Sequence, residues 1–138
     1  MKLTKLLSGV LATIVYAAFS TAAVAGNSIK IGDINSYKRL PAHTIPYRQG
    51  ALLGIEHINA NGGLLGGRKL ELVSRDDQGK PGEAVKIAEE LFQREDGVLI
   101  SGRLFSHIGL ALTSYAGQKK RLYLAAEPLA DALSLIHI

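Results

Sequence analysis

The segment from residue 54 to residue 75 constrains the fold more than any other part of the chain. Residues 54–60 continue a helical pattern, Asn61-Gly62 interrupts it, and residues 69–75 then have the alternation of a β-strand. Asparagine and glycine both tolerate the left-handed conformation that ends helices. A helix that passes within a few residues into a strand is half of a β-α-β unit, which is typical of parallel sheets.

The same alternation of strand and helix runs through residues 29–125. Residues 29–33, 69–74, 98–100 and 122–125 read as strands, and residues 98–100 are wholly apolar, as in a strand buried on both faces. Between them lie three amphipathic helices, one beginning near Pro46, one at Pro81, and one spanning about residues 106–119. The apolar face of the first helix consists of Tyr47, Ala51, Ile55 and Ile58. This βαβαβαβ order predicts an α/β fold with a doubly wound parallel sheet.

Residues 1–25 have the pattern of a secretory signal peptide. Lys2 and Lys5 form a basic start, an apolar run follows to Phe19, and Ala23-Val24-Ala25 is an Ala-x-Ala cleavage site. The apolar run is shorter than the ~20 residues that a membrane span needs. We expect cleavage after Ala25 and export of the mature chain.

Charge and cysteine content exclude several classes of function. The chain carries a formal net charge of +4, and removing Lys2 and Lys5 leaves +2, with charges of both signs interspersed. Such a distribution does not predict the basic patch that nucleic-acid binding needs. The chain has no cysteine, so disulfides, metal–thiolate sites and thiol nucleophiles are excluded. The sequence also has no metal-ligand cluster and no convincing triad, so we expect no cofactor, no metal and no catalytic residue.

An ordered set of motifs resembles a known family. Residues 56–68 read Glu-His-Ile-Asn-Ala-Asn-Gly-Gly-Leu-Leu-Gly-Gly-Arg, and after the strand comes Asp76-Asp77-Gln78-Gly79-Lys80-Pro81. This string resembles the periplasmic leucine/isoleucine/valine-binding proteins, the substrate-binding components of ABC transporters. The resemblance implies a location in the periplasm and a flavodoxin-like strand order 2-1-3-4. It also implies that residues 26–132 form the incomplete first lobe of a two-lobe protein. It also implies capture of a branched-chain amino acid or a related small carboxylate or amide, delivery to an ABC permease, and a monomeric state at full length.

Three loops are expected to form the binding site. Ligands of open α/β sheets bind beyond the carboxyl ends of the strands, at the point where the strand order reverses. If that point lies between the first and third strands, the relevant loops are residues 35–37, 101–106 and 126–131. The second loop leads into a helix N-terminus, whose free N–H groups and dipole favour an anion.

Five residues of these loops are candidate ligand contacts: Ser106, Arg103, Phe105, Tyr37 and Glu127. In the resembled family a serine after the third strand binds the α-carboxylate of the ligand, and Ser106 is in the matching place. The alternative is that Ser106 only N-caps the helix. Arg103 is a candidate partner of a ligand carboxylate, although loop arginines are usually solvated.

The loop after the fourth strand departs from the family pattern. Pro128 lacks an N–H, and residues 126–131 contain no hydroxyl group, so Glu127 is the candidate for the ligand's ammonium. The ligand therefore stays open among branched-chain amino acids, aromatic acids, short amides and other small polar-ended solutes.

Two other motifs have simpler interpretations. The pair Asp76-Asp77 could serve acid–base chemistry or a metal, but its place before Gly79 and Pro81 favours a carboxylate that caps the next helix or its turn. His107 follows Ser106, yet adjacent helical residues point about 100° apart, so we expect a solvent-facing histidine.

Two further classes of function are alternatives. The domain could be a periplasmic sensory or assembly module that binds a partner protein with the same fold. A secreted α/β enzyme is disfavoured, because the sequence has no Gly-x-Ser-x-Gly elbow and no convincing triad.

The last six residues are expected to be a non-native tail. Residues 133–138 read Leu-Ser-Leu-Ile-His-Ile, which is also the translation of CTGTCTCTTATACACATC, the mosaic end of a transposase-based sequencing library. The chain stops after four predicted strands, so we expect the rest of the first lobe and the whole second lobe to be missing from it.

Overall fold

The structure is a computed structural model that describes residues 28–102 and 105–126. It contains the seven predicted elements in the predicted order. They are β1 (Ile29–Asn35), α2 (Pro41–Ala60), β2 (Leu70–Asp76), α3 (Pro81–Gln93), β3 (Leu99–Gly102), α4 (Ser106–Lys119) and β4 (Leu122–Ala125). The predicted signal peptide and the predicted tail lie outside the described residues.

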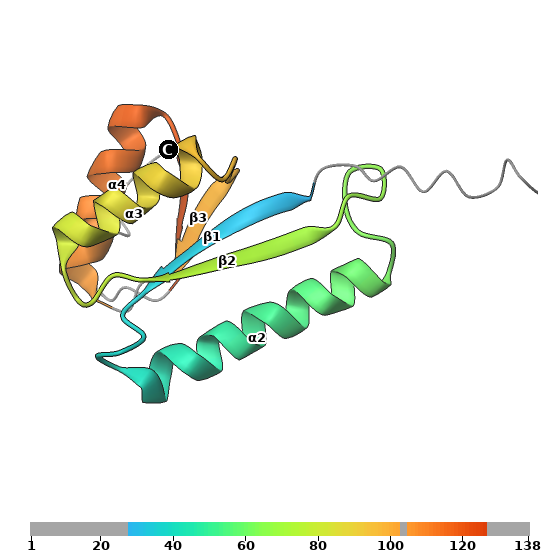
Figure 1. Ribbon diagram of the computed structural model, residues 1–138, viewed down its shortest axis with the longest axis horizontal. Coiled ribbons are helices and arrows are strands. Elements are labelled where there is room, and N and C mark those ends of the chain that lie inside the picture. Colours follow the sequence, from blue (N-terminus) through green and yellow to red (C-terminus); the bar gives the residue numbers. More distant parts are fainter. Residues whose placement is uncertain (1–27, 103–104, 127–138) are drawn as a thin grey trace, which may run out of the picture.

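The four strands form one parallel sheet in the order β2-β1-β3-β4. Helix α2 covers one face of this sheet, and α3 and α4 cover the other (Figure 1). Right-handed crossovers require this arrangement, because the chain first moves from β1 to β2 and then returns across β1 to β3. The predicted doubly wound fold and its strand order 2-1-3-4 are confirmed.

Helix α2 begins five residues earlier than predicted, at Pro41 rather than Pro46. Both prolines suit a first helical turn, and the sequence rule selected the second one. Pro46 instead lies inside α2, where its missing N–H leaves the carbonyl of Ala42 without a helical partner. Ala42 is exposed, so water can supply the missing donor.

The end of α2 also differs in detail from the prediction. Asn61 follows the last helical residue with φ −86°, so it does not adopt the left-handed conformation. Gly62 and Gly63 adopt it instead, with φ values of +100° and +79°. The Gly63 N–H donates to the carbonyl of Ile58 at 2.9 Å, which closes the helix. The other elements differ from their predicted bounds by no more than two residues, and α4 and β4 match them.

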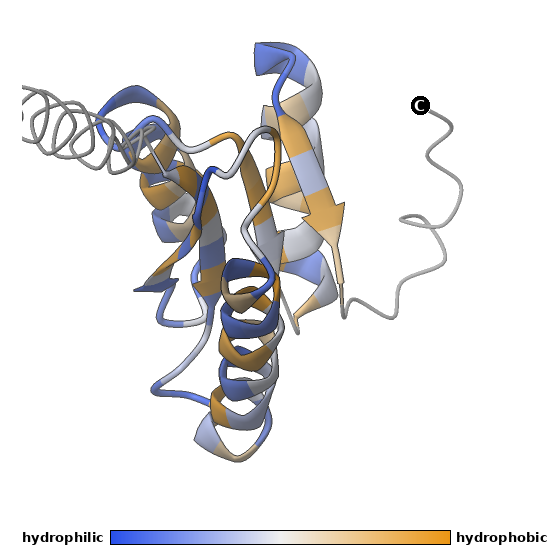
Figure 2. Ribbon diagram, turned by 90° about the vertical axis from the view of Figure 1, so that its right-hand side faces the viewer, coloured by the Kyte–Doolittle hydropathy of each residue, from blue (hydrophilic) through white to orange (hydrophobic). Residues whose placement is uncertain are grey.

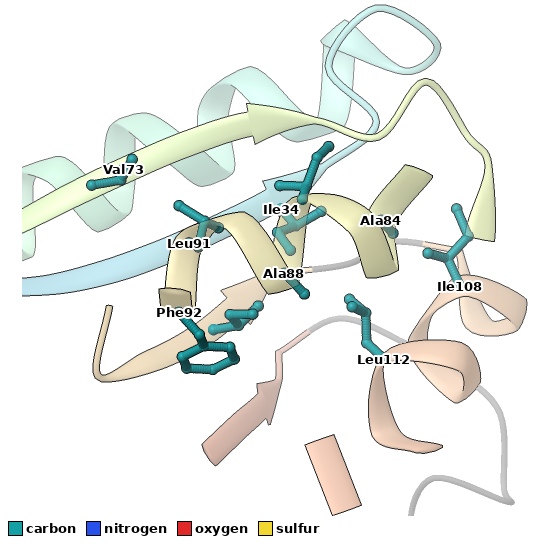
Figure 3. Close-up of a cluster of buried hydrophobic side chains, with 10 residues drawn as sticks. Ile34, Val73, Ala84, Ala88, Leu91, Phe92, Ile108 and Leu112 are labelled. Atoms are coloured by element: carbon teal, nitrogen blue, oxygen red, sulfur yellow. The ribbon is translucent and has the colours of Figure 1, made fainter. Parts of the chain in front are cut away.

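The hydrophobic core lies between the sheet and the pair α3 and α4 (Figure 3). Burying one large aliphatic or aromatic side chain stabilises a fold by about 1.5–3 kcal/mol. The regular spacing of apolar residues along α3 places a whole face of that helix in this cluster, as predicted. The buried members are Ile34, Val73, Ala84, Ile87, Ala88, Leu91, Phe92, Ile100, Ile108 and Leu112.

The opposite face of the sheet is covered only in part. The predicted stripe of α2, from Tyr47 to Ile58, is its less exposed side, and α2 packs mainly on β2. Side chains alternate along a strand, and Tyr123 of β4 packs on the core, so Leu122 and Leu124 face the α2 side. Each of these leucines is 58% exposed, and β4 is largely hydrophobic in Figure 2.

No helix within residues 28–102 and 105–126 has both the length and the apolarity of a membrane span.

Candidate functional site

The carboxyl ends of β1 and β3 lie side by side, as the predicted site requires. The two strands are parallel neighbours, and Asp33 is the register partner of Ser101. After β1 come Ser36 and Tyr37, and Ser36 is fully buried. After β3 the chain leads into the N-terminus of α4 at Ser106. The fold therefore brings two of the three predicted loops together at the switch in strand order.

Ser106 is the first residue of α4, and the N-cap position belongs to Phe105. The Phe105 carbonyl accepts hydrogen bonds from the N–H groups of Ile108 and Gly109, both at 3.1 Å. The interpretation of Ser106 as the N-cap is therefore wrong, because the helix begins at Ser106, one residue earlier than that role requires. The Ser106 side chain is partly exposed at the start of the helix, where the dipole favours an anion.

Phe105 has a structural role beside its candidate role. Its ring is partly buried and packs against the core cluster, and its centroid lies 5.7 Å from that of His107. His107 itself is exposed, as predicted. Arg103 and Glu127 lie outside the described residues, so their predicted roles stay predictions.

Tyr37 is anchored at both its hydroxyl and its ring. The hydroxyl donates to Oδ2 of Asp33, and the Arg48 guanidinium lies 4.9 Å from the ring centroid. Burial, and then the hydrogen bond to Asp33 and its charge, raise the pKa of Tyr37 above its ordinary value. The phenol therefore stays a neutral donor at physiological pH, and its hydroxyl is engaged within the protein.

Asp33 belongs to a row of polar side chains that crosses the sheet below the loops. We call Ser74, Asp33 and Ser101 the polar row, because they are register partners on β2, β1 and β3. Ser74 donates to Oδ2 of Asp33 at 2.9 Å, and Asp33 is only 1% exposed. Burying a carboxylate is costly unless hydrogen bonds compensate, so these hydroxyl donors are what permits a charge at this depth.

The polar row is also linked to α2. The Tyr47 hydroxyl and Ser101 Oγ lie 3.1 Å apart, although 54 residues separate them in the sequence. The sequence reasoning did not identify Asp33, Ser74 or Tyr47 as part of the site. A usable signal was present, because Asp33 follows Ile29 and Ile31, and Ser74 follows Leu70 and Leu72, at the spacing of two that puts residues on one face of a strand. The sequence does not say that these positions share a row.

Asp77 stabilises the turn before α3, as one of its two interpretations predicted. Its Oδ1 accepts hydrogen bonds from Ser36 Oγ at 2.5 Å and from the N–H of Gly79 at 2.8 Å. The neighbouring Asp76 accepts one from the N–H of Gln78 at 2.9 Å. Among the residues that the structure describes, no three His, Cys, Asp or Glu side chains are grouped to hold a metal ion.

Solved structures with the same fold are substrate-binding proteins. A branched-chain amino acid transporter substrate-binding protein from Streptococcus pneumoniae, in complex with isoleucine, matches with 25% identity and a TM-score of 0.70. The match covers 78% of this chain and 31% of that one. An ABC-type branched-chain amino acid transporter from Rhodopseudomonas palustris matches with 25% identity and a TM-score of 0.71, over 78% and 29% of the two chains. A periplasmic binding protein from Burkholderia mallei matches with 29% identity and a TM-score of 0.62, over 78% and 28%.

Two further comparisons define how far the likeness extends. No match was found among the curated proteins. The chain spans about a third of the length of the solved structures that it matches. A family model described as periplasmic binding protein matches residues 28–134, which is most of the chain. The chain therefore belongs to the periplasmic binding protein family, whose members bind solutes in the periplasm and are not enzymes.

Proposed function

We propose that this chain is part of the solute-binding component of an ABC importer for an amino acid or a related small carboxylate. The observation that carries this proposal is the position of Ser106, in the first turn of the helix that follows β3, the strand next to β1. A hydroxyl group, the N–H groups of the helix start and the helix dipole can all stabilise a carboxylate there. The isoleucine in the Streptococcus pneumoniae protein supports the choice of an amino acid.

The mechanism follows from the fold class. In the complete protein, residues 26–132 would form part of a first lobe, and closure of a second lobe over the solute would enclose it by hinge motion without chemistry. Residues 1–25 would direct export and be removed after Ala25. The closed protein would then deliver its solute as a monomer to the permease in the inner membrane.

The remaining candidate residues have distinct expected roles. Tyr37 and Phe105 would contribute ring surface, since the Tyr37 hydroxyl is bonded to Asp33 and Phe105 packs on the core. Arg103 would pair with an anionic group of the solute, and Glu127 would pair with its ammonium. Exchanging Glu127 for glutamine should then weaken binding of amino acids more than binding of carboxylates that lack an amine.

Isothermal titration of the complete mature protein against the standard amino acids and small aromatic acids such as benzoate tests the proposal. Saturable binding of one member is expected. Ser106→Ala should weaken that binding by about 1–3 kcal/mol, because a charged partner loses a hydrogen bond. Ser114→Ala is the matched control, since Ser114 is an exposed serine later in the same helix.

Two results would contradict the proposal. Absence of binding across the whole panel would exclude an amino-acid or aromatic-acid solute. Uptake of the bound solute that persists in cells without the permease would exclude the transport role and favour a sensory or assembly module.

A further inference from the structure

Asp33 is positioned to hold the Tyr37 side chain in place by a hydrogen bond. Its Oδ2 accepts hydrogen bonds from the Tyr37 hydroxyl and from Ser74 Oγ. Its Oδ1 lies on the side of Gly102, where a Cβ atom would come within 2.8 Å of this oxygen. The carboxylate thus fills the space between the end of β3 and the loop that follows β1.

The loop that carries Tyr37 combines a local backbone turn with side-chain contacts to the rest of the fold. The N–H groups of Arg39 and Leu40 donate to the carbonyl of Ser36 at 3.1 and 3.0 Å, which forms a local turn. Lys38 and Arg39 are exposed. Beyond Ser36, the side-chain contacts of the loop include the Tyr37–Asp33 hydrogen bond, the Arg48 guanidinium over the Tyr37 ring and the Arg39 side chain beside Gly79. A hydrogen bond to an ionised acceptor is about twice as strong as a neutral one.

We propose that Asp33 is a positioning residue of the solute site, which acts by fixing Tyr37 and its loop at the switch between β1 and β3. Asp33 is 1% exposed and its Oδ2 accepts from Tyr37 and Ser74, so it would act on the solute through Tyr37. This role rests on the proposed function as far as affinity is concerned, but the position of the loop is a property of the free protein. The two parts can therefore be tested separately.

Limited trypsin digestion of the complete mature protein tests the position of the loop without a solute. Cleavage after Lys38 and Arg39 reports local opening when opening and closing are fast. Tyr37→Phe should accelerate this cleavage about tenfold, which corresponds to about 1.4 kcal/mol. Asp33→Asn should accelerate it several-fold, because a neutral acceptor replaces the carboxylate. The double variant should cleave no faster than Tyr37→Phe alone.

Two variants serve as controls for this digestion. Ser28→Ala removes another hydroxyl-to-carboxylate hydrogen bond, from Ser28, just before β1, to Glu71 of β2, near the amino ends of these strands. It should leave cleavage after Lys38 and Arg39 unchanged. Val73→Ala lowers global stability through the core, so it should raise cleavage throughout the chain and not at this loop alone.

A second experiment measures the dissociation constant of whichever amino acid the wild-type protein binds. Tyr37→Phe and Asp33→Asn should each raise it, and the double variant should equal Tyr37→Phe, because residues that act through one contact are not additive. Wild-type cleavage rates in both single variants, or multiplicative effects on affinity, would show that Asp33 only stabilises the fold. If the wild-type protein binds no amino acid, the proposed function fails, while the digestion still decides whether Asp33 positions the loop.

Discussion

The Asn59 side chain makes two hydrogen bonds to the backbone of Leu70. Its Oδ1 accepts from the Leu70 N–H at 2.7 Å, and its Nδ2 donates to the Leu70 carbonyl at 2.9 Å. These bonds join the last turn of α2 to the first residue of β2. The family motif Ile-Asn-Ala-x-Gly-Gly thus has a physical reason here, because the asparagine links the end of the helix to the start of the strand.

Asn59→Ala should lower the free energy of unfolding of the complete protein by about 1–3 kcal/mol. The substitution leaves the polar backbone groups of Leu70, a mostly buried residue, without their side-chain partner. Chemical denaturation measures the change. Asn61→Ala is the control, since Asn61 is exposed and bonds only within its own helix end, and its effect should stay within about 0.5 kcal/mol.

Gly63→Ala should destabilise the connection after α2 more than Gly62→Ala does. Both glycines have positive φ values, so alanine costs about 1–2 kcal/mol at either position. A Cβ at Gly63 would in addition overlap the backbone carbonyl of Arg68, whereas a Cβ at Gly62 meets nothing within 4 Å. Equal melting temperatures for the two variants would contradict this placement of the connection.

Gly54→Ala should stabilise the protein by about 0.5–1 kcal/mol. Gly54 lies inside α2, and a Cβ there would meet no atom within 4 Å, so alanine only reduces the freedom of the unfolded chain. Thermal unfolding should show a higher melting temperature. Gly32→Ala is the contrasting variant, because its Cβ would come within 2.8 Å of Leu91 Cδ1 in the core and should destabilise.

The stability of the protein should fall at alkaline pH in a way that depends on Tyr37. Burial and Asp33 raise the pKa of Tyr37 in the folded state, whereas the unfolded chain has the ordinary value of about 10. The folded state therefore binds more protons above pH ~10, and stability is lost as the pH rises through the folded pKa. Tyr37→Phe should reduce this slope in urea denaturation between pH 8 and about 11. An unchanged slope would show that Tyr37 is not coupled to Asp33 in solution.

The Tyr47–Ser101 contact should couple α2 to β3. Tyr47→Phe and Ser101→Ala should each cost about 0.5–1.5 kcal/mol, the net value of one hydrogen bond. The double variant should cost less than the sum of the two, since both substitutions remove the same interaction. Additive losses would show that the two hydroxyl groups bond elsewhere in solution.

The amino-acid sequence by itself determined the local elements. Apolar spacing gave the class of every helix and strand, because side-chain periodicity acts over a few residues and needs no information about distant ones. The regular stripe of α3 and the bounds of α4 and β4 followed in this way. The start of α2 was misplaced because two prolines satisfy the same local rule, and the choice between them depends on packing.

The tertiary structure alone decided which residues meet. Asp33, Ser74 and Ser101 form one row only because β1 lies between β2 and β3, and the periodicity of a strand does not specify its neighbours. The strand order was predicted from the family resemblance. The hydrogen bond from Tyr37 to Asp33 was not predicted from the sequence. The physical reason is that strand pairing and buried hydrogen bonds depend on long-range packing free energy, whereas the periodicity of side chains is local.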